Sequence, residues 1–175
     1  MDNGLTVAVS FEMDQGTGNN SDKGFDSHSV TVSSDAMGSL TFAGHGGSTA
    51  SSKIDTTAAG DMWDNFDGTE YVGGATVADG VSANGGTDNS FFYSSPDVMD
   101  GLNFTLSYNP QNATNSGETG VGINYTGLEG LSVSYAKSDE ETYAANTTGD
   151  NTVIKASYAY GPVTVSYSEM DHDEG

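Results

Sequence analysis

Cysteine and arginine are absent from this chain of 175 residues, in which proline occurs only 3 times. Without cysteine there is no disulfide framework and no thiolate metal site. Four lysines stand against 25 acidic residues, so the formal net charge is −21 at pH 7. Nucleic-acid recognition starts from a basic surface, and this balance therefore excludes nucleic acid as a partner. Repulsion from anionic headgroups equally disfavours peripheral docking on a membrane surface.

Long apolar runs are also lacking. No window approaches the roughly 18 consecutive apolar residues that a membrane-spanning helix needs, and no signal-peptide pattern opens the chain. Hydrophobic residues make up 34% of the sequence, whereas a typical soluble domain contains roughly 45–50%. A thick conventional core is therefore hard to build. Two classes fit: a disordered low-complexity chain, or a β-protein whose apolar side faces lipid.

The sequence does contain runs that alternate with period two, the pattern of a sheet with one apolar face. In residues 102–108, for example, Leu, Phe, Leu and Tyr alternate with Asn, Thr and Ser. There are nine such runs, and no stretch predicts a helix. The runs are 5–13, 28–34, 39–45, 89–95, 102–108, 119–125, 131–136, 152–160 and 163–170.

Long and short connections alternate along the chain. The long ones are 14–27, 46–88, 109–118 and 137–151, and tight turns lie between them. The face opposite the apolar one consists of Ser, Thr, Asn, Gly and Ala, which are too small and polar to fill the core of a sandwich. Short turns on one side, a small polar lining and an apolar exterior are typical of a membrane barrel. We therefore predict an all-β fold, an antiparallel transmembrane β-barrel.

Four stretches resemble the general porins of Gram-negative bacteria. They are GSLTFAGHG (38–46), NSFFYSSPDVMDGLNFTLSY (89–108), GVGINYTGLEGLSVSYA (120–136) and IKASYAYGPVTVSYS (154–168). Each motif is degenerate, and the match rests on their order and on the alternation of long and short connections. The resemblance implies homotrimers of roughly 16-stranded barrels in the outer membrane, through which small hydrophilic solutes and ions diffuse.

About nine strands would form only part of such a barrel. Both ends of the chain look interrupted, because Met1 leads straight into a strand and residues 171–175 have the composition of a polar loop. We therefore expect residues 1–175 to be one partial porin barrel domain, an internal fragment of a longer protein.

The chain departs from the family pattern along the expected pore wall. General porins commonly carry basic residues after the glycine-start strand and in the next strand, whereas Gly44 or His45, and Phe92, stand at these places here. Lys155, on the small polar face, is the one cation that we place in the lumen.

Residues 46–88 form the longest connection and the one around which the chain is organised. The segment has 43 residues and carries seven carboxylates against the single cation Lys53. A structureless connection of this length in a compact domain usually means function or disorder. We predict that it folds into or over the mouth of the barrel and narrows the pore. Within it, Trp63 is expected to pack the segment against the wall.

Carboxylates that line a passage of low dielectric raise the local concentration of cations. The densest set is Asp61, Asp64, Asp67 and Glu70, which predicts a pore that favours cations. In the alternative interpretation these acids lie on a solvated outer loop. Glu12 and His45 are further candidates for the lumen, although Glu12 also fits a strand-end carboxylate in water.

No cofactor is predicted, and calcium binding is kept as a second option for the carboxylates of this segment. Carboxylates and carbonyls suit calcium, yet their spacing here does not match an EF-hand loop, and the three histidines are too scattered for a metal site. No Ser, His and Asp constellation predicts an enzyme. The alternative from another class is a secreted all-β surface adhesin or calcium-stabilised binding module. Dependence on detergent would separate that soluble module from a membrane barrel.

Overall fold

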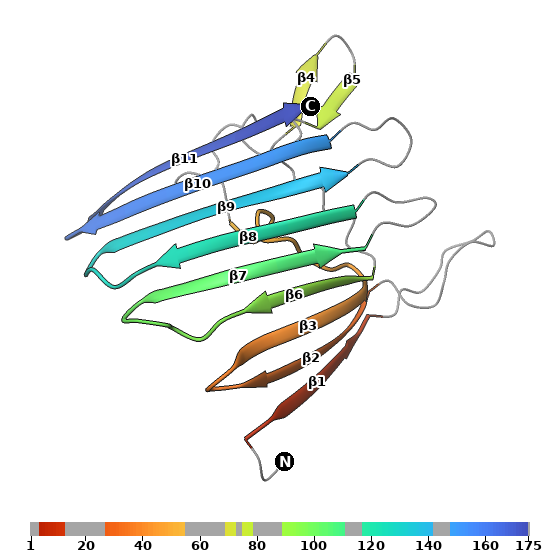
Figure 1. The fold of residues 1–175 in the computed structure, drawn as a ribbon. Helices are drawn as coiled ribbons and strands as arrows, with labels where there is room; N and C mark the ends of the chain where they lie inside the picture. The colour runs from red at the N-terminus through yellow and green to blue at the C-terminus, as the bar shows by residue number, and fades with distance from the viewer. Residues whose placement is uncertain are drawn as a thin grey trace.

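The computed structural model describes residues 4–12, 27–54, 69–72, 75–78, 89–110, 117–141 and 148–174. Within these residues every regular element is a β-strand (Figure 1). The strands are β1 (Thr6–Phe11), β2 (His28–Ser34), β3 (Gly38–His45), β4 (Thr69–Val72), β5 (Ala75–Ala78), β6 (Ser90–Ser94), β7 (Leu102–Asn109), β8 (Gly117–Tyr125), β9 (Leu131–Glu141), β10 (Thr148–Tyr160) and β11 (Val163–Glu174). No helix in the described part of the chain is long and apolar enough to span a membrane.

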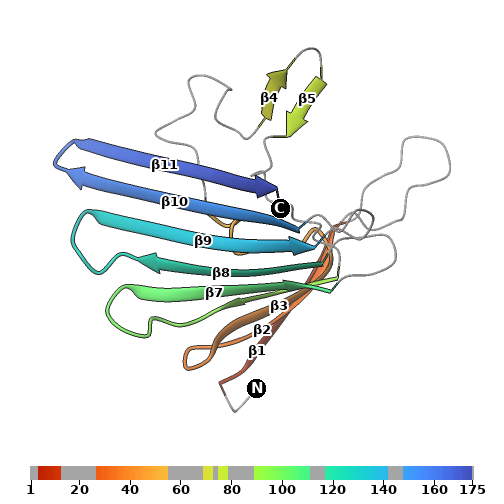
Figure 2. The same cartoon turned by 45° about the horizontal axis from the view of Figure 1, so that its top comes forward.

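Nine strands form one antiparallel sheet in the order β1-β2-β3-β6-β7-β8-β9-β10-β11. The hairpin β4–β5 is a separate two-stranded sheet that lies between β3 and β6 in the sequence. β1 and β11 are the two edges of the main sheet, which is curved and open (Figure 2). The predicted all-β class and the nine antiparallel strands are confirmed, and the sheet is consistent with part of a barrel wall.

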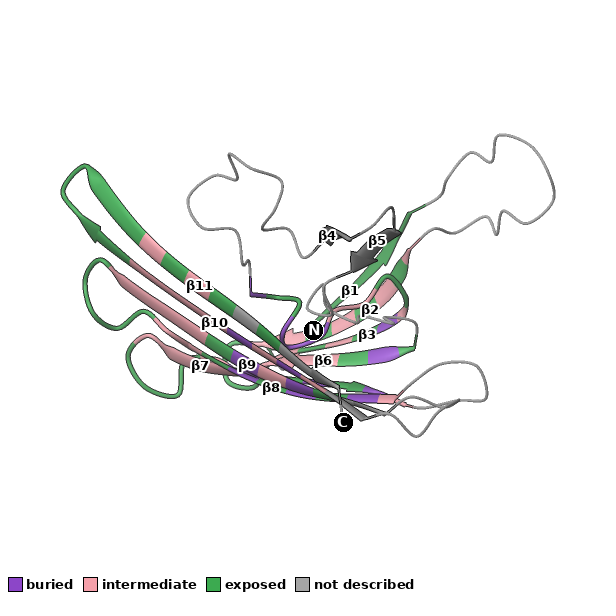
Figure 3. Ribbon diagram, turned by 90° about the horizontal axis from the view of Figure 1, so that it is seen from above, coloured by how far each residue is buried: buried purple, intermediate pink, exposed green. Residues whose placement is uncertain are grey.

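The two faces of the sheet differ in chemistry because side chains alternate between them. One row of register partners on the first face is Thr41, Phe92, Ser107, Gly120, Ser138 and Asn151. A neighbouring row on the second face is Leu40, Tyr93, Leu106 and Val121. Residues 49–54 lie against the first face, on the concave side of the sheet (Figure 3), and we call it the inner face. The second is the outer face.

Large apolar side chains are exposed on the outer face. Val9, Ile123 and Val165 are 54%, 52% and 67% exposed. The buried apolar residues in the described part of the chain are few and mostly small, namely Ala43, Ala50, Ile54, Ala136 and Val153. A water-soluble sandwich would cover the outer face with a second layer. An apolar exterior of this kind is instead stable against lipid.

Short turns connect neighbouring strands of the sheet at the end drawn on the left in Figure 2. Gly130 has a φ of 78°, in the left-handed region that glycine adopts without steric cost. A Cβ atom at this position would lie 2.5 Å from the carbonyl oxygen of Ala159. The turn between β8 and β9 can therefore approach β10 this closely only with glycine at position 130.

The prediction of a loop over residues 137–151 is wrong at both ends, and residues 142–147 lie outside the described part of the chain. β9 continues to Glu141 and β10 begins at Thr148. Lys137 Nζ lies 2.6 Å from Asp150 Oδ2 and 3.7 Å from Asp139 Oδ1. The backbone ladder thus extends past the apolar residues into a charged segment, in which Asp139 and Asp150 are direct register partners. Apolar alternation alone does not reveal such an extension.

The expectation of a polar loop at residues 171–175 is also wrong, since β11 continues to Glu174 and pairs with β10 throughout. The segment 46–88 is not structureless either. β4 and β5 flank Gly73 and Gly74, and two glycines between short β-prone runs are a hairpin signal. The two strands have only four residues each, which is too short for a period-two pattern to be evident.

Candidate functional site

The chain that leaves β3 packs back onto the inner face of the sheet. Ala50 N donates a hydrogen bond to Ser107 Oγ on β7 at 3.0 Å. The hydroxyls of Ser51 and Ser138, the latter on β9, lie 2.9 Å apart. We call residues 49–54 the docking turn; Ala50 and Ser51 are 1% and 4% exposed.

Hydrogen bonds within the docking turn hold its shape. Thr49 N donates to Ser52 Oγ at 2.8 Å, and Ser52 N donates to Thr49 Oγ1 at 3.1 Å. Ile54 N also donates to the carbonyl oxygen of Ser51 at 3.0 Å. Serine and threonine side chains that bond nearby backbone groups favour turns of this kind. The turn therefore has its own local bonds as well as its two bonds to the sheet.

Small residues on the inner face make room for the docking turn. Gly120 lies between Ser107 and Ser138 in the register. A Cβ atom on Gly120 would lie 2.8 Å from Ser138 Oγ and 3.2 Å from Ala50 Cβ. Ala50 and Ile54 form a buried cluster with Ala136 and Val153. This contact combines two polar anchors with a small apolar core.

Lys53 of the docking turn lies over an aromatic ring of the wall. Its Nζ is 5.7 Å from the ring centroid of Phe92 on β6. Phe92 belongs to the inner face, where its register partners are Thr41 and Ser107. The inner face therefore has a second cation besides Lys155 among the described residues.

A curved antiparallel sheet with an apolar exterior, and with the connection after β3 docked on a small polar interior, is the arrangement expected of a pore wall. The sequence model of the family described as Gram-negative porin matches residues 1–175. The chain belongs to the Gram-negative porin family. No curated protein and no solved structure matches the chain.

Family membership places this porin in the outer membrane of a Gram-negative bacterium, where the family forms channels for transport rather than enzymes. It decides in favour of a channel over the alternative of a soluble adhesin or calcium-stabilised module. In the described residues of this porin, no group of three or more His, Asp or Glu side chains could hold a metal ion.

The structure describes the side chains of three of the predicted site residues. Lys155 is half-buried on the inner face, with Ser134 and Ser168 as register partners. Glu12 follows β1, is exposed, and accepts a hydrogen bond from Ser27 Oγ at 3.2 Å. His45 is exposed at the end of β3. The three are separate positions along the wall and do not form one cluster.

The remaining predicted residues are not tested by the structure. Asp61, Trp63, Asp64 and Asp67 lie outside the described residues. The backbone of Glu70 belongs to β4 and pairs with Val77, while its side chain is not described. Their assignment to a constriction stays a prediction.

The sequence alone did not predict which inner-face residues contact the docking turn. Ser107, Gly120 and Ser138 each occupy a small polar position in a different strand, and only the register aligns them in one row. The available signal was the run Ser-Thr-Ala-Ser-Ser at 48–52, which is rich in turn-forming hydroxyls. It predicts a turn but not the place where that turn docks.

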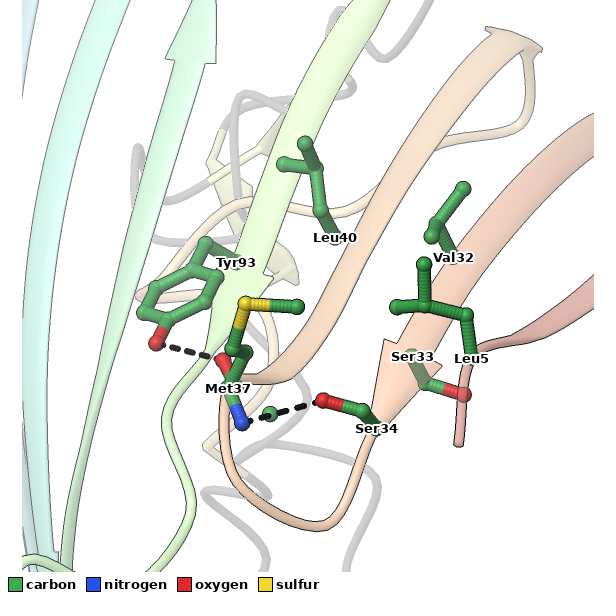
Figure 4. Close-up of a pocket in the computed structure, with 8 residues that line it drawn as sticks. Leu5, Val32, Ser33, Ser34, Met37, Leu40 and Tyr93 are labelled. Atoms are coloured by element: carbon green, nitrogen blue, oxygen red, sulfur yellow. Dashed lines mark hydrogen bonds between the residues drawn. The ribbon is translucent and has the colours of Figure 1, made fainter. Parts of the chain in front are cut away.

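A hollow of about 260 Å³ also lies near the short turn between β2 and β3 (Figure 4). Tyr93 Oη donates to the carbonyl oxygen of Met37 at 2.8 Å, and Met37 N donates to Ser34 Oγ at 3.1 Å. Val32 and Leu40, which line it, are outer-face residues. The hollow is thus a depression in the lipid-facing surface and not part of the polar interior.

Proposed function

We propose that this porin is a passive diffusion channel for small hydrophilic solutes and ions, that it favours cations, and that residues 46–88 set its width. The docking turn carries the proposal. Because residues 49–54 pack on the inner face, the chain after β3 starts out along the lumen wall. Asp61 follows Ile54 by seven residues, which span at most about 25 Å when fully extended. Asp61, the first carboxylate of the acidic run, therefore lies within this distance of the docking turn.

The charge preference follows from the composition of this segment. Seven carboxylates against one lysine create a negative potential, and low-dielectric walls focus it within a narrow passage. In this proposal Asp61, Asp64, Asp67 and Glu70 attract cations at the constriction. Trp63 packs the segment against the wall.

Other positions would modulate the passage. Lys155 and His45 contact solutes along the wall, and Glu12 lies near the rim at the end with the long connections. Transport needs no catalytic step, because the solute gradient drives it. We further propose that the nine strands are one part of a closed barrel and that three such barrels assemble as a homotrimer, as the resemblance to general porins implies.

The deciding experiment measures the reversal potential of the full-length porin in a planar bilayer under a potassium chloride gradient. We expect a reversal potential that indicates cation preference. We also expect conductance steps in groups of three, one step for each barrel of the trimer. The variant D61N/D64N/D67N/E70Q should lose most of that potential. A matched control neutralises four exposed carboxylates at the short-turn end, Asp35, Asp97, Asp100 and Glu129.

The control removes the same charge far from the proposed constriction and should leave most of the cation preference in place. Equal effects of the two quadruple variants would assign the preference to the overall charge and overturn the role of the acidic run. An anion-directed potential in the unmodified porin would overturn the cation preference itself.

A further inference from the structure

One row of the inner face of this porin consists entirely of side chains that form hydrogen bonds. It crosses five adjacent strands, because each member is the direct register partner of the next. From β7 to β11 the members are Asn103, Asn124, Ser134, Lys155 and Ser168. All five are half-buried. Neighbouring strands lie about 4.8 Å apart, so this polar row is about 19 Å long.

The next inner-face row toward the long connections has a different composition and is covered. It contains Gly122, Ala136 and Val153 as register partners. Ala136 and Val153 are buried in the cluster with Ala50 and Ile54 of the docking turn. Rows on the same face are two residues apart along each strand, which is about 7 Å. A solute that passes the docking turn toward the short-turn end therefore meets the polar row next.

The polar row contains donors and acceptors side by side. Asn124 Nδ2 donates a hydrogen bond to Asn103 Oδ1 at 3.1 Å, and this bond orients the two amides relative to each other. Each amide has two N–H donors and a carbonyl oxygen with two lone pairs. A serine hydroxyl also both donates and accepts, whereas the ammonium of Lys155 only donates. Both kinds of group thus occur along the row.

This mixture matches hydroxyl groups better than it matches ions. A carboxylate or phosphate oxygen only accepts, and a solute ammonium only donates, so each would use half of the groups in the row. A sugar hydroxyl donates one hydrogen bond and accepts others. The spacing of about 4.8 Å between neighbouring members is comparable with the width of a pyranose ring. Successive members of the row are therefore placed to bond successive hydroxyls of one saccharide.

We propose that the polar row is a binding site for neutral saccharides on the pore wall. The proposal rests on the proposed passage of solutes along the inner face, but on neither the cation preference nor the constriction by residues 46–88. Each hydrogen bond to the sugar replaces one to water, so its net contribution is small. The site holds the solute weakly, as a channel requires, because a bound solute must also leave.

The first test adds maltotriose, a neutral linear trisaccharide, to the full-length porin in a planar bilayer and records the ion current. Maltotriose should reduce the current in a saturable way. The control is polyethylene glycol of equal hydrodynamic radius, whose ether oxygens accept hydrogen bonds but do not donate them. It should reduce the current only through the volume it occupies, without saturation. Equal effects of the two solutes would show sieving by size and would overturn the proposal.

The amide pair is tested by Asn103→Leu combined with Asn124→Leu, which keeps the side-chain size and the net charge. The maltotriose concentration that gives half of the maximal block should rise about tenfold, because the bonds to both amides are lost. The reversal potential without sugar should not change. The matched control is Thr31→Val combined with Thr41→Val, whose hydroxyls lie 2.8 Å apart on the inner face and outside the polar row. The same rise in both double variants would overturn a specific site.

A single substitution gives a second measurement. Lys155→Met keeps the length of the side chain but removes its donors, and it should also raise the half-blocking concentration of maltotriose. An unchanged concentration in both Lys155→Met and the double leucine variant would overturn the site. A cation-selective porin without saturable block by maltotriose overturns the saccharide site alone. Saturable block in a porin without cation preference overturns the cation preference alone.

Discussion

At the scale of single residues, Gly120 contributes by having no side chain. It lies between two serines that anchor the docking turn, with Ala50 directly above it. In one row across three adjacent strands, a glycine without a side chain on β8 thus lies between a serine hydroxyl on β7 and another on β9. This order of side chains allows a segment after β3 to lie flat on the wall. A bulkier residue in the middle of the row would lift the turn away.

We therefore expect Gly120→Val to displace the docking turn. Overpacking costs typically about 1–3 kcal/mol, and here the added atoms would meet Ala50 Cβ and Ser138 Oγ. The single-channel conductance should rise, because the segment that we propose narrows the pore loses its contact with the inner face. The control is Ala8→Val, an exposed inner-face position on β1. An unchanged conductance in Gly120→Val would argue against the docking turn as part of the constriction.

The two serines can be tested together. Each hydrogen bond contributes a net of about 0.5–1.5 kcal/mol, so Ser107→Ala with Ser138→Ala should weaken docking by about 1–3 kcal/mol. We expect larger fluctuations of the open-channel current. Ser132 and Ser157 are register partners on the same face, and changing both to alanine provides the control. Fluctuations of the same size in both double variants would contradict a specific anchoring role.

At the scale of elements, alternation predicts the nine strands well but locates their ends poorly. Apolar residues every second position mark the portion of a strand that meets lipid, and this portion was identified in all nine cases. β9 and β10 extend beyond it, with polar partners such as Lys137 and Asp150. The docking turn was not predictable for another reason. Its anchors, Ser107 and Ser138, are 57 and 87 residues away from their partners in the chain.

The ion pair at the end of β9 and β10 should contribute little to stability. The side chains of Lys137 and Asp150 are 41% and 45% exposed, and exposed pairs contribute about 1 kcal/mol or less. Lys137→Met should therefore change the midpoint of denaturant unfolding only slightly. High salt should remove most of the difference. A large decrease in the midpoint that does not depend on salt would mean that the strand extension depends on this pair.

At the scale of the whole molecule, charge and apolar surface are separated. On β11 the outward residues Val163, Val165 and Tyr167 precede the acids Glu169 and Asp171. On β9, Leu131, Val133 and Tyr135 likewise precede Lys137 and Asp139. In both strands the apolar part begins at the short-turn end, and the charged part lies at the end with the long connections. The chain can therefore combine a net charge of −21 with a lipid-facing band.

This separation predicts opposite results for the same substitution at two adjacent positions. Val165 is 67% exposed in the middle of the outward apolar run of β11, whereas Ser166 belongs to the inner face opposite Ser157. A lysine on the lipid face near the membrane midplane costs about 2–4 kcal/mol. Val165→Lys should lower the free energy of unfolding in lipid vesicles by this amount, as measured by denaturant titration. Ser166→Lys should stay within about 0.5 kcal/mol of the unmodified porin, as surface changes usually do.

If both lysines cost the same, β11 does not have one face in lipid and the other in water. If Ser166→Lys is the costlier change, the two faces are assigned the wrong way round.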